Sequence, residues 1–361
     1  MHPRPTDPVA EPDAADRLIL DHAREYLEQT TAVTVLGEPV TELALALEGR
    51  RDVRVHQDLL RDERELTDRC TRLGHQNVTA HPLDRSLVEG AELVLLRLPK
   101  GLDRLRDLAG LIAAHADPGV VVVAGGRIKH MTPAMNDVLG GFFGRVDVTH
   151  ARQKSRALIA TGPRDGRDPV PHSRVHALPG VGDVTVCALG GVFAGTGVDI
   201  GTRFLLENLP EHLDGEGIVD LACGSGLVAT VLALQHPDRT IIACDQSAAA
   251  VTSAVATAEA NGVRNRVDVR RDDALSLLED DSVSFIALNP PFHEGSSVDE
   301  QIAPRLFADA ARVLRPGGEL WTVWNSHLDH RPHLDRLVGS TRQVARNAKF
   351  TVTSSRARPA R

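Results

Sequence analysis

The sequence predicts an α/β protein with two tandem domains, each built on a mostly parallel, doubly wound sheet. Three observations support this fold class. Short apolar runs of strand length alternate with helical patterns along most of the 361 residues, and this alternation is typical of parallel sheets covered by helices. A stretch rich in Pro, Gly and Arg at 161–180 interrupts the alternation, as an exposed linker would. The chain is also longer than a typical single domain.

The breaks in the alternation divide the chain into four parts. We predict a disordered tail over residues 1–16, which is rich in Pro and Asp and lacks an apolar face. A first domain follows over 17–162 and a linker over 163–180. The second domain covers 181–361.

The apolar runs place the individual elements. In the first domain, strands are predicted at 31–37, 52–58, 92–99, 120–126 and 156–162, with a helix at 102–115. A hairpin-like pair of strands is predicted near 175–178 and 184–189. The second domain is predicted to continue with a strand and loop at 217–226, helices at 227–236, 248–262 and 305–318, strands at 240–245, 267–274, 282–292 and 319–325, and a final antiparallel pair within 342–358.

The two domains share an order of elements. A strand, a Pro, a helix, a Pro-Gly pair and a further strand recur at 92–126 and at 284–325. A duplication predicts this repeat, although any two doubly wound domains share part of the rhythm. The first domain lacks an acidic residue followed by a Gly-x-Gly loop after its first strand. We therefore expect the first copy to bind or position a substrate and the second copy to carry the chemistry.

Composition and charge exclude several classes of protein. Hydrophobic residues at 42% and charged residues at 25% are ordinary for a globular chain. The net charge of −8 gives no overall attraction to nucleic acid, so such a contact needs a local basic patch. Four cysteines without CxxC spacing favour a cytoplasmic protein without disulfides or structural zinc. No apolar run has the length of a membrane helix, no signal-peptide pattern is found, and no metal site is predicted.

Two loops after predicted strands have the residues of a nucleotide site. Asp220 ends the strand of VDLACGSG, and Gly224 and Gly226 then allow a ligand to approach the backbone near a helix N-terminus. Asp245 ends the next strand, where an acid can bind ribose hydroxyls or cap the following helix. A dinucleotide-binding dehydrogenase fits these residues as well, because GSGLVA matches the GxGxxA fingerprint.

A third loop, RRDDALS, contains two neighbouring acids. Asp272 and Asp273 follow the third strand of the second domain. One of them is placed to accept a hydrogen bond from an adenine amino group, and the other interpretation is a solvated acidic turn.

The stretch NPPF after the fourth strand favours methyl transfer to an amino group over hydride transfer. An exocyclic amine is a poor nucleophile, and the side-chain carbonyl of Asn289 with the backbone carbonyl of Pro290 can accept its two hydrogens and orient the lone pair. Pro290 and Pro291 stiffen this shelf. Phe292 can stack on a planar base, a contact worth about 1–3 kcal/mol.

These motifs together resemble a known family. VDLACGSG, CD, DDA and NPPF are similar to class I S-adenosylmethionine-dependent methyltransferases. GGVFAGTGVDIGTRFLLENLP, LRLPKGLDRL and VVAGGRIKHM resemble, over most of 20–356, bacterial ribosomal RNA guanine-N2 methyltransferases of the RsmC/RlmG type, and the HLD and NAKFTV segments are closer to the large-subunit enzyme. The resemblance implies two tandem Rossmann-like class I methyltransferase domains, the N-terminal one degenerate.

The resemblance also implies roles for individual residues. The catalytic residues are expected to be Asn289, Pro290, Pro291 and Phe292. The residues expected to hold S-adenosylmethionine are Asp220, Cys223, Gly224, Gly226, Asp245, Asp272, Asp273 and Gly201. Ala222 replaces the usual Gly of the first loop, and we expect cofactor binding to survive. Phe193 and Phe292 are expected to contact the substrate base.

Basic residues gather in the later part of the first domain. Lys129, Lys154 and Arg156 are expected to contact RNA phosphates, which position an RNA without reading its sequence. A solvated surface of an Arg-rich protein is the other explanation for this cluster.

The sequence as a whole predicts transfer of a methyl group from S-adenosylmethionine to guanine N2 in ribosomal RNA. The large-subunit 23S rRNA is favoured, as free RNA or within a ribosomal subunit or assembly intermediate, and the small-subunit 16S rRNA is the first alternative. A protein glutamine-N5 methyltransferase with the same NPP shelf is the second alternative, although its shelf usually ends in Tyr. A non-enzymatic RNA factor that binds the cofactor is the third.

Overall fold

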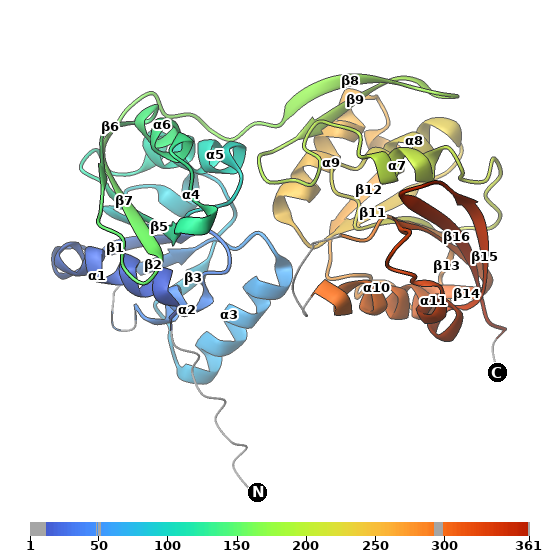
Figure 1. Ribbon diagram of the computed structural model, residues 1–361, viewed down its shortest axis with the longest axis horizontal. Coiled ribbons are helices and arrows are strands. Elements are labelled where there is room, and N and C mark those ends of the chain that lie inside the picture. Colours follow the sequence, from blue (N-terminus) through green and yellow to red (C-terminus); the bar gives the residue numbers. More distant parts are fainter. Residues whose placement is uncertain (1–11, 48, 50–51, 292–298, 360–361) are drawn as a thin grey trace, which may run out of the picture. The chain divides into compact units, whose positions relative to one another are not determined.

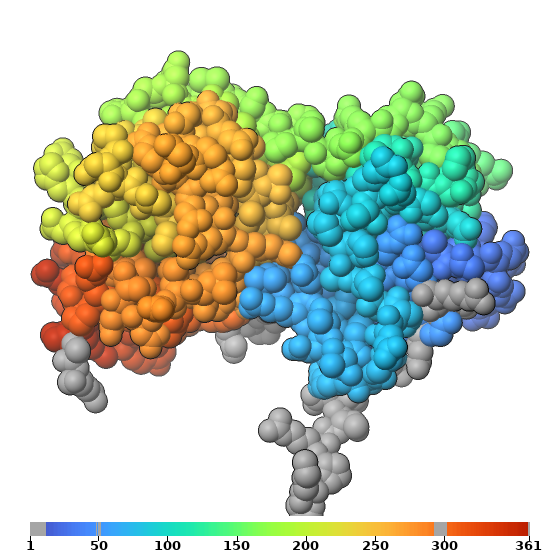
Figure 2. Space-filling view, turned by 180° about the vertical axis from the view of Figure 1, so that it is seen from behind, coloured from blue at the N-terminus to red at the C-terminus, as the bar shows by residue number. Residues whose placement is uncertain are grey.

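The computed structural model of the protein describes residues 12–47, 49, 52–291 and 299–359, which form two compact units. Unit 1 ends at Val170 and unit 2 begins at Pro171. In the space-filling view each unit is one continuous body, coloured from blue to green in unit 1 and from green to red in unit 2 (Figure 2).

Unit 1 is a seven-stranded sheet with the order β3-β2-β1-β4-β5-β7-β6, in which β5–β7 and β6–β7 are antiparallel pairs and the other pairs are parallel. Its strands are β1 (Ala32–Leu36), β2 (Asp52–Val55), β3 (Val78–Ala80), β4 (Leu93–Arg97), β5 (Val121–Arg127), β6 (Phe143–Val148) and β7 (Ser155–Pro163). Its helices are α1 (Ala14–Gln29), α2 (Thr41–Leu45), α3 (Leu60–Leu73), α4 (Arg85–Val88), α5 (Leu102–His115) and α6 (Ala134–Gly140).

The helices of unit 1 cover both faces of this sheet (Figure 1). One face is packed by α1, α2 and α3, and the other by α4, α5 and α6. Helix α5 has the bounds that the spacing of its apolar residues predicted, and Leu105, Leu108 and Ile112 of that helix are buried. Its apolar side chains recur at helical spacing and therefore form one face against the sheet.

Unit 2 repeats this sheet with the order β12-β11-β10-β13-β14-β16-β15, again with its last two strands antiparallel. Its strands are β8 (His172–Leu178), β9 (Gly182–Ala188), β10 (Ile218–Leu221), β11 (Ile241–Asp245), β12 (Val267–Arg271), β13 (Val283–Leu288), β14 (Leu314–Asn325), β15 (Gly339–Arg346) and β16 (Phe350–Ala357). Its helices are α7 (Ile200–Leu206), α8 (Leu227–Gln235), α9 (Ala248–Ala260), α10 (Asp299–Val313) and α11 (Arg331–Leu337).

Both predicted α/β domains are thus present, and the predicted fold class is confirmed. Strand by strand, β1 to β5 correspond to β10 to β14, and β6 and β7 correspond to β15 and β16, because the two strand orders are the same. The helices correspond as well: α7, α8 and α9 cover one face of the second sheet, and α10 and α11 cover the other (Figure 1). None of the helices in the described parts of the chain combines the length and the apolar character that crossing a bilayer requires.

The predicted hairpin is formed by β8 and β9, which pair antiparallel as a separate two-stranded sheet. Three backbone N–H groups of this hairpin and the residue after it donate to side chains of α9 and its C-cap: Thr185 to Asn261, Cys187 to Thr257 and Leu189 to Ser253, all at 2.9 Å. The hairpin therefore fixes the start of the 189–199 segment that leads into α7.

Two boundaries differ from the sequence prediction. Helix α1 begins at Ala14, inside the segment predicted as a tail, because Asp13 caps it by accepting from the N–H groups of Ala15 and Asp16. Residues 1–11 of that tail lie outside the described residues. Strand β8 begins at His172, earlier than the strand predicted near 175–178 and further into the predicted linker 163–180, since pairing with β9 compensates for its exposed, polar side chains.

Candidate active site

The carboxyl ends of β10, β11 and β13 meet at one edge of the unit 2 sheet. Strand β10 lies between the other two and pairs with both in parallel, with Leu221 opposite Cys244 and Leu288. The residues that follow these strands are therefore neighbours across the sheet edge. Asp245 and Asn289, which the sequence assigns to separate loops, both lie at this edge.

The loop after β10 follows a left-handed path. Ala222, Gly224 and Gly226 have φ angles of +57°, +54° and +73°, a region that glycine enters at least cost. A Cβ on Gly226 would lie 2.7 Å from the Cβ of Ala254 on α9, so glycine is required there for the two helices to pack. A Cβ on Gly224 would meet no heavy atom of the described residues within 4 Å, which leaves the loop open to a ligand on that side.

Asp245 ties this loop to the end of β11. Its Oδ2 accepts from the N–H of Gly224 at 3.0 Å, and its Oδ1 accepts from the N–H of Ser247 at 2.9 Å. The N–H of Cys223 donates to the carbonyl of Cys244 at 3.0 Å. Burial, together with the charges of Asp245 and its neighbour Asp220, raises the pKa of the Cys223 thiol, so this cysteine contributes backbone and packing rather than a thiolate.

Asp220 is buried beneath the same loop. Its Oδ2 accepts from the N–H of Ala229, in the first turn of α8, at 2.9 Å. Burial raises the pKa of Asp220 to about 7, and the negative charge of Asp245 also raises it. The hydrogen bond from the N–H of Ala229 acts in the opposite direction and lowers this pKa. With only 3% of its surface exposed, Asp220 holds the loop and the helix start in register.

The two acids after β12 have different surroundings. Asp272 is 1% exposed, its Oδ1 accepts from the hydroxyl of Ser276 at 2.5 Å, and its Oδ2 accepts from the N–H of Leu277 at 2.9 Å. Asp273 is only partly buried and pairs with Arg305 of α10 at 2.6 Å. Asp272 therefore shapes the turn, whereas Asp273 is the acid whose side chain reaches another element.

The side chain of Asn289 is anchored on one side. Its Nδ2 donates to the hydroxyl of Thr202 at 2.9 Å and to Oδ2 of Asp199 at 3.3 Å. Its Oδ1 is buried and accepts no hydrogen bond from the residues that the structure describes. Since most buried polar atoms in folded proteins are paired, this carbonyl is available to a ligand that donates.

The rest of the predicted shelf is described only in part. Pro290 is buried and Pro291 is exposed. Phe292, which was predicted to stack on the base, lies outside the described residues, as does His293. The proposed contacts of Phe292 with a substrate stay a prediction.

Two further predicted residues come from the segment before β10. Phe193 is exposed over 55% of its surface, which is unusual for such a large apolar side chain and leaves its ring accessible. Gly201 lies in the first turn of α7, where a Cβ would approach Oδ2 of Asp199 to 2.9 Å. Gly201 thus makes room for the carboxylate that anchors Asn289.

Sequence reasoning did not single out Thr202 and Arg305. Thr202 stands three residues after Asp199, the N-cap of α7, and this spacing is a common signal for side chains that meet at a helix start. The partnership of Thr202 with Asn289 has no local signal, because 87 residues separate the two in the chain.

Lys129 and Lys154 are exposed on unit 1 near other cations. Slight desolvation and the charges of Lys129, Lys100 and Arg127 lower the pKa of His130, so these groups lie close together. The N–H of Ile128, the residue before Lys129, donates to the carbonyl of Lys154 at 3.0 Å. The structure therefore brings these two predicted RNA contacts together.

Arg156 is less accessible than the two lysines. It lies on β7 opposite Gly126 of β5 and is half-buried. Its Nε is buried and has no partner in the described parts of the chain. Arg156 therefore lies at the border of the basic cluster.

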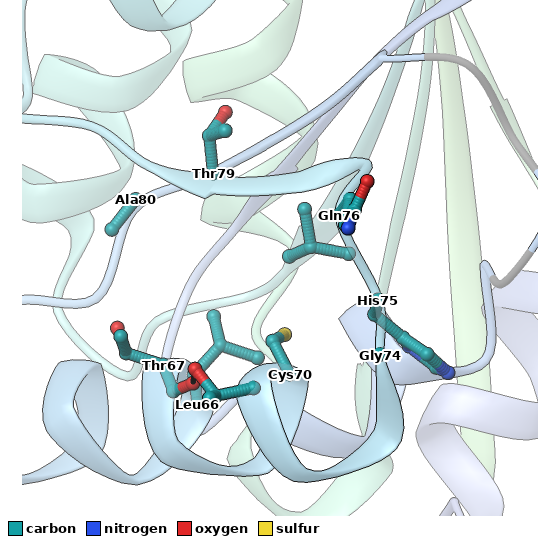
Figure 3. Close-up of a pocket in the computed structure, with 10 residues that line it drawn as sticks. Leu66, Thr67, Cys70, Gly74, His75, Gln76, Thr79 and Ala80 are labelled. Atoms are coloured by element: carbon teal, nitrogen blue, oxygen red, sulfur yellow. Dashed lines mark hydrogen bonds between the residues drawn. The ribbon is translucent and has the colours of Figure 1, made fainter.

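A cavity of about 590 Å³ opens elsewhere, between α3 and β3 of unit 1 (Figure 3). Leu66, Thr67 and Cys70 line it from the helix, and Thr79 and Ala80 line it from the strand. It contains none of the residues that the motifs predicted. We place the candidate site at the edge of the unit 2 sheet because the acids, the open glycine loop and Asn289 converge there.

The chain matches two family models. Residues 183–354 match the methyltransferase small domain, and residues 3–164 match the RLMG N-terminal domain. The ribosomal RNA large subunit methyltransferase G of Streptomyces avermitilis is 34% identical over 96% of this chain and 93% of its own length. The chain belongs to the ribosomal RNA large subunit methyltransferase G family. The family predicted from the sequence, an rRNA methyltransferase, is thereby confirmed.

Other proteins support this family and its fold. The large subunit methyltransferase G of Pseudomonas fluorescens is 33% identical over 97% of this chain and 94% of its own length. The T. thermophilus 16S rRNA N2 G1207 methyltransferase, whose structure contains AdoMet and guanosine, superposes with a TM-score of 0.76 over 99% of this chain and 97% of its own. At 23% identity, this second comparison shows the fold of two tandem domains.

Proposed function

We propose that the protein transfers a methyl group from S-adenosylmethionine to the exocyclic N2 of a guanine in large-subunit ribosomal RNA. The observation that carries this proposal is the Asn289 carbonyl, buried and without a donor among the described residues, at the carboxyl edge of the sheet. Membership of the large subunit methyltransferase G family supports the substrate.

The residues at this edge suit S-adenosylmethionine. The Gly224 side of the loop is open to a ligand, and the carboxylate of Asp245 is fixed beside it, where ribose hydroxyls can donate to it. Asp273 lies further along the same edge, after the neighbouring strand β12, for the adenine end. The shape of this loop site is held by Asp220, Cys223, Gly226 and Asp272. S-adenosylmethionine bound there would supply an electrophilic methyl group, with its sulfonium sulfur as the leaving group.

Asn289 and Pro290 act on the amine that receives the methyl group. Accepting the two N–H hydrogens with the Asn289 side chain and the Pro290 carbonyl fixes the nitrogen lone pair in one direction. The same oxygens stabilise the positive charge that develops on nitrogen. After transfer, the excess proton on nitrogen is lost to solvent.

Unit 1 supplies the contact with RNA. The exposed cations Lys100, Arg127, Lys129 and Lys154 gather on one part of its surface. Phosphate contacts by such a cluster hold RNA without base recognition, which suits a positioning domain. Since the target guanine sits in a folded RNA, it has to leave its stack to reach Asn289.

The function is tested by mass spectrometry of rRNA nucleosides from wild-type cells and cells that lack the gene. We expect one N2-methylguanosine of the large-subunit rRNA to disappear in the deleted strain. Loss from the small-subunit rRNA alone, or loss of a methylated glutamine with all rRNA sites intact, would replace the proposal by one of its alternatives.

A second experiment tests the role of Asn289 in the purified protein. Asn289→Ala is expected to lower methyl transfer by about 100-fold or more, because it removes a stabilising acceptor, while S-adenosylmethionine still binds. Asn208→Ala is the matched control, because Asn208 lies just after α7 and its side chain donates to the carbonyl of Phe204 in that helix. Full activity in Asn289→Ala refutes the shelf.

A further inference from the structure

Asn289 has one amide orientation that its neighbours permit. An ionised carboxylate only accepts hydrogen bonds, so the amide atom 3.3 Å from Oδ2 of Asp199 has to be Nδ2. The hydroxyl of Thr202 accepts from the same Nδ2 at 2.9 Å. The N–H of Thr202 also donates to Oδ2 of Asp199 at 3.1 Å. The three residues therefore form one hydrogen-bonded group that occupies Nδ2 of Asn289, while its Oδ1 meets no donor of the described residues.

We propose that Asp199 and Thr202 are positioning residues that lock the amide of Asn289 with its carbonyl toward the substrate amine. This inference rests on the proposed function, because it concerns how the same site recognises its nucleophile. A reversed amide would present Nδ2 to the substrate, and two donors would then face each other. The lock thus selects a group that donates N–H and rejects one that only accepts.

The first turn of α7 is built around this lock. Asp199 is the N-cap of α7, and the bond from the N–H of Thr202 fixes its carboxylate at the helix start. Gly201 leaves the space for that carboxylate, since a Cβ there would lie 2.9 Å from Oδ2 of Asp199 and 3.1 Å from the ring of Phe350. Gly201 therefore supports the lock through Asp199.

Unit 1 contains the same arrangement with different side chains. Its helix α1 also begins with an N-cap acid, Asp13, which accepts from the N–H of Asp16 three residues later. Arg97, at the end of β4, donates to both carboxylates, at 2.6 Å to Asp13 and 2.9 Å to Asp16. The N-cap acid, the residue three positions on and the residue at the carboxyl end of the fourth strand, which is the last residue of β4 and the first after β13, thus meet in both copies.

The comparison between the copies shows what is specific to the active one. In unit 1 the fourth-strand residue, Arg97, has only donors, and they meet two acids. In unit 2 the second acid is replaced by Thr202 and the arginine by Asn289, so the group gains an acceptor, Oδ1, that its own members leave unused. The placement of the three residues is common to both copies of the fold. The unpaired carbonyl oxygen of Asn289 is specific to unit 2.

The test compares variants at Thr202 in single-turnover methyl transfer to an rRNA fragment. Thr202→Val removes the acceptor at nearly constant shape, and we expect the rate to fall about 10- to 100-fold, as for a misplaced catalytic group, with S-adenosylmethionine affinity and RNA affinity within about twofold of wild type. Thr202→Ser restores the hydroxyl and should recover most of the rate. Thr252→Val, on the exposed face of α9, is the control for loss of a threonine hydroxyl.

A double variant separates positioning from a structural role. If Thr202 acts through Asn289, then Thr202→Val in the Asn289→Ala background changes the remaining rate by less than about twofold. The same loss in both backgrounds, an unchanged rate in Thr202→Val, or no recovery in Thr202→Ser overturns the lock. Where Thr202→Val does not fold, Asp199→Asn replaces it, because the isosteric amide no longer forces the orientation; an unchanged rate then counts against the lock.

The failure of this inference differs from the failure of the proposed function. A wild-type protein that transfers no methyl to guanine in rRNA defeats the function. A wild-type protein that does transfer it, with Thr202 and Asp199 variants of equal rate, defeats only the lock.

Discussion

The N–H of Gly224 donates to the carboxylate of Asp245 at 3.0 Å, which joins the loop after β10 to the end of β11. The second oxygen of Asp245 accepts from the N–H of Ser247 at 2.9 Å. A carboxylate held by two backbone donors keeps one direction, and the half-buried Asp245 is therefore preorganised for a ligand at the sheet edge.

Replacement of Asp245 by Ala should weaken S-adenosylmethionine binding by about 10- to 100-fold, since a charge-assisted hydrogen bond contributes about 1.5–3 kcal/mol. Isothermal titration calorimetry measures the dissociation constant. Asp238→Ala, an exposed acid after α8, is the control and should bind as wild type does. Equal affinities of the Asp245 variant and wild type would show that this carboxylate does not contact the cofactor.

Asp220 should make the stability of the free protein depend on pH. Burial raises its pKa from 3.8 to about 7, so the folded state keeps the proton to a higher pH than the unfolded chain does. The contribution of Asp220 to the free energy of unfolding is complete below about pH 4 and is lost as the pH rises through about 7. Asp220→Asn cannot titrate and keeps an acceptor for Ala229, so it should be more stable than wild type above pH 7, by at most about 4 kcal/mol.

Urea denaturation at pH 5, 6, 7 and 8 measures this difference for Asp220→Asn against wild type. Asp214→Asn, at an exposed position before β10, is the control and should follow the wild-type curve. Parallel curves for the Asp220 variant and wild type contradict the prediction.

Ala222→Gly should stabilise the fold slightly. The φ of +57° at Ala222 costs a residue with a Cβ about 1–2 kcal/mol, whereas glycine loses about 0.5–1 kcal/mol more through chain entropy. The expected gain is about 0.5–1 kcal/mol in the free energy of unfolding, measured by urea denaturation. Ala233→Gly, inside α8, should instead destabilise by about 1 kcal/mol or more. A loss of stability in Ala222→Gly would mean that the loop does not hold this backbone angle.

The basic cluster of unit 1 should act through phosphate. In the double variant Lys129→Ala, Lys154→Ala, the slope of log affinity for an rRNA fragment against log salt should become shallower by about 0.7–0.9 for each phosphate that the variant no longer neutralises. Filter binding from low to moderate salt measures the slope, and S-adenosylmethionine affinity should not change. Arg145→Ala, an exposed cation on β6 that pairs with Asp147, is the control. A slope equal to that of wild type assigns RNA binding to another surface.

Much of the fold follows from local patterns. The strands β1, β4, β5, β10, β11 and β13 are short apolar runs, and all were predicted near their observed positions. The short polar strands β3 and β6 were missed, because most of their side chains are exposed and leave no hydrophobic period to detect. Helix α10 ends at Val313, earlier than predicted, because Leu314 to Gly318 form the first part of β14 and not the last turn of the helix.

The sequence alone determined which residues end the strands of the second sheet, and this placed Asp220, Asp245 and Asn289 at one edge, because parallel strands present their carboxyl ends together. It also led us to expect that the first copy does not carry the chemistry, since Arg97 stands where Asn289 stands in the second. Only the tertiary structure decided how the amide of Asn289 is turned. Hydrophobic periodicity predicts only which of the residues close in sequence face the core. The hydrogen bond between Asn289 and Thr202 joins positions 87 residues apart. It therefore forms only once α7 packs against the sheet.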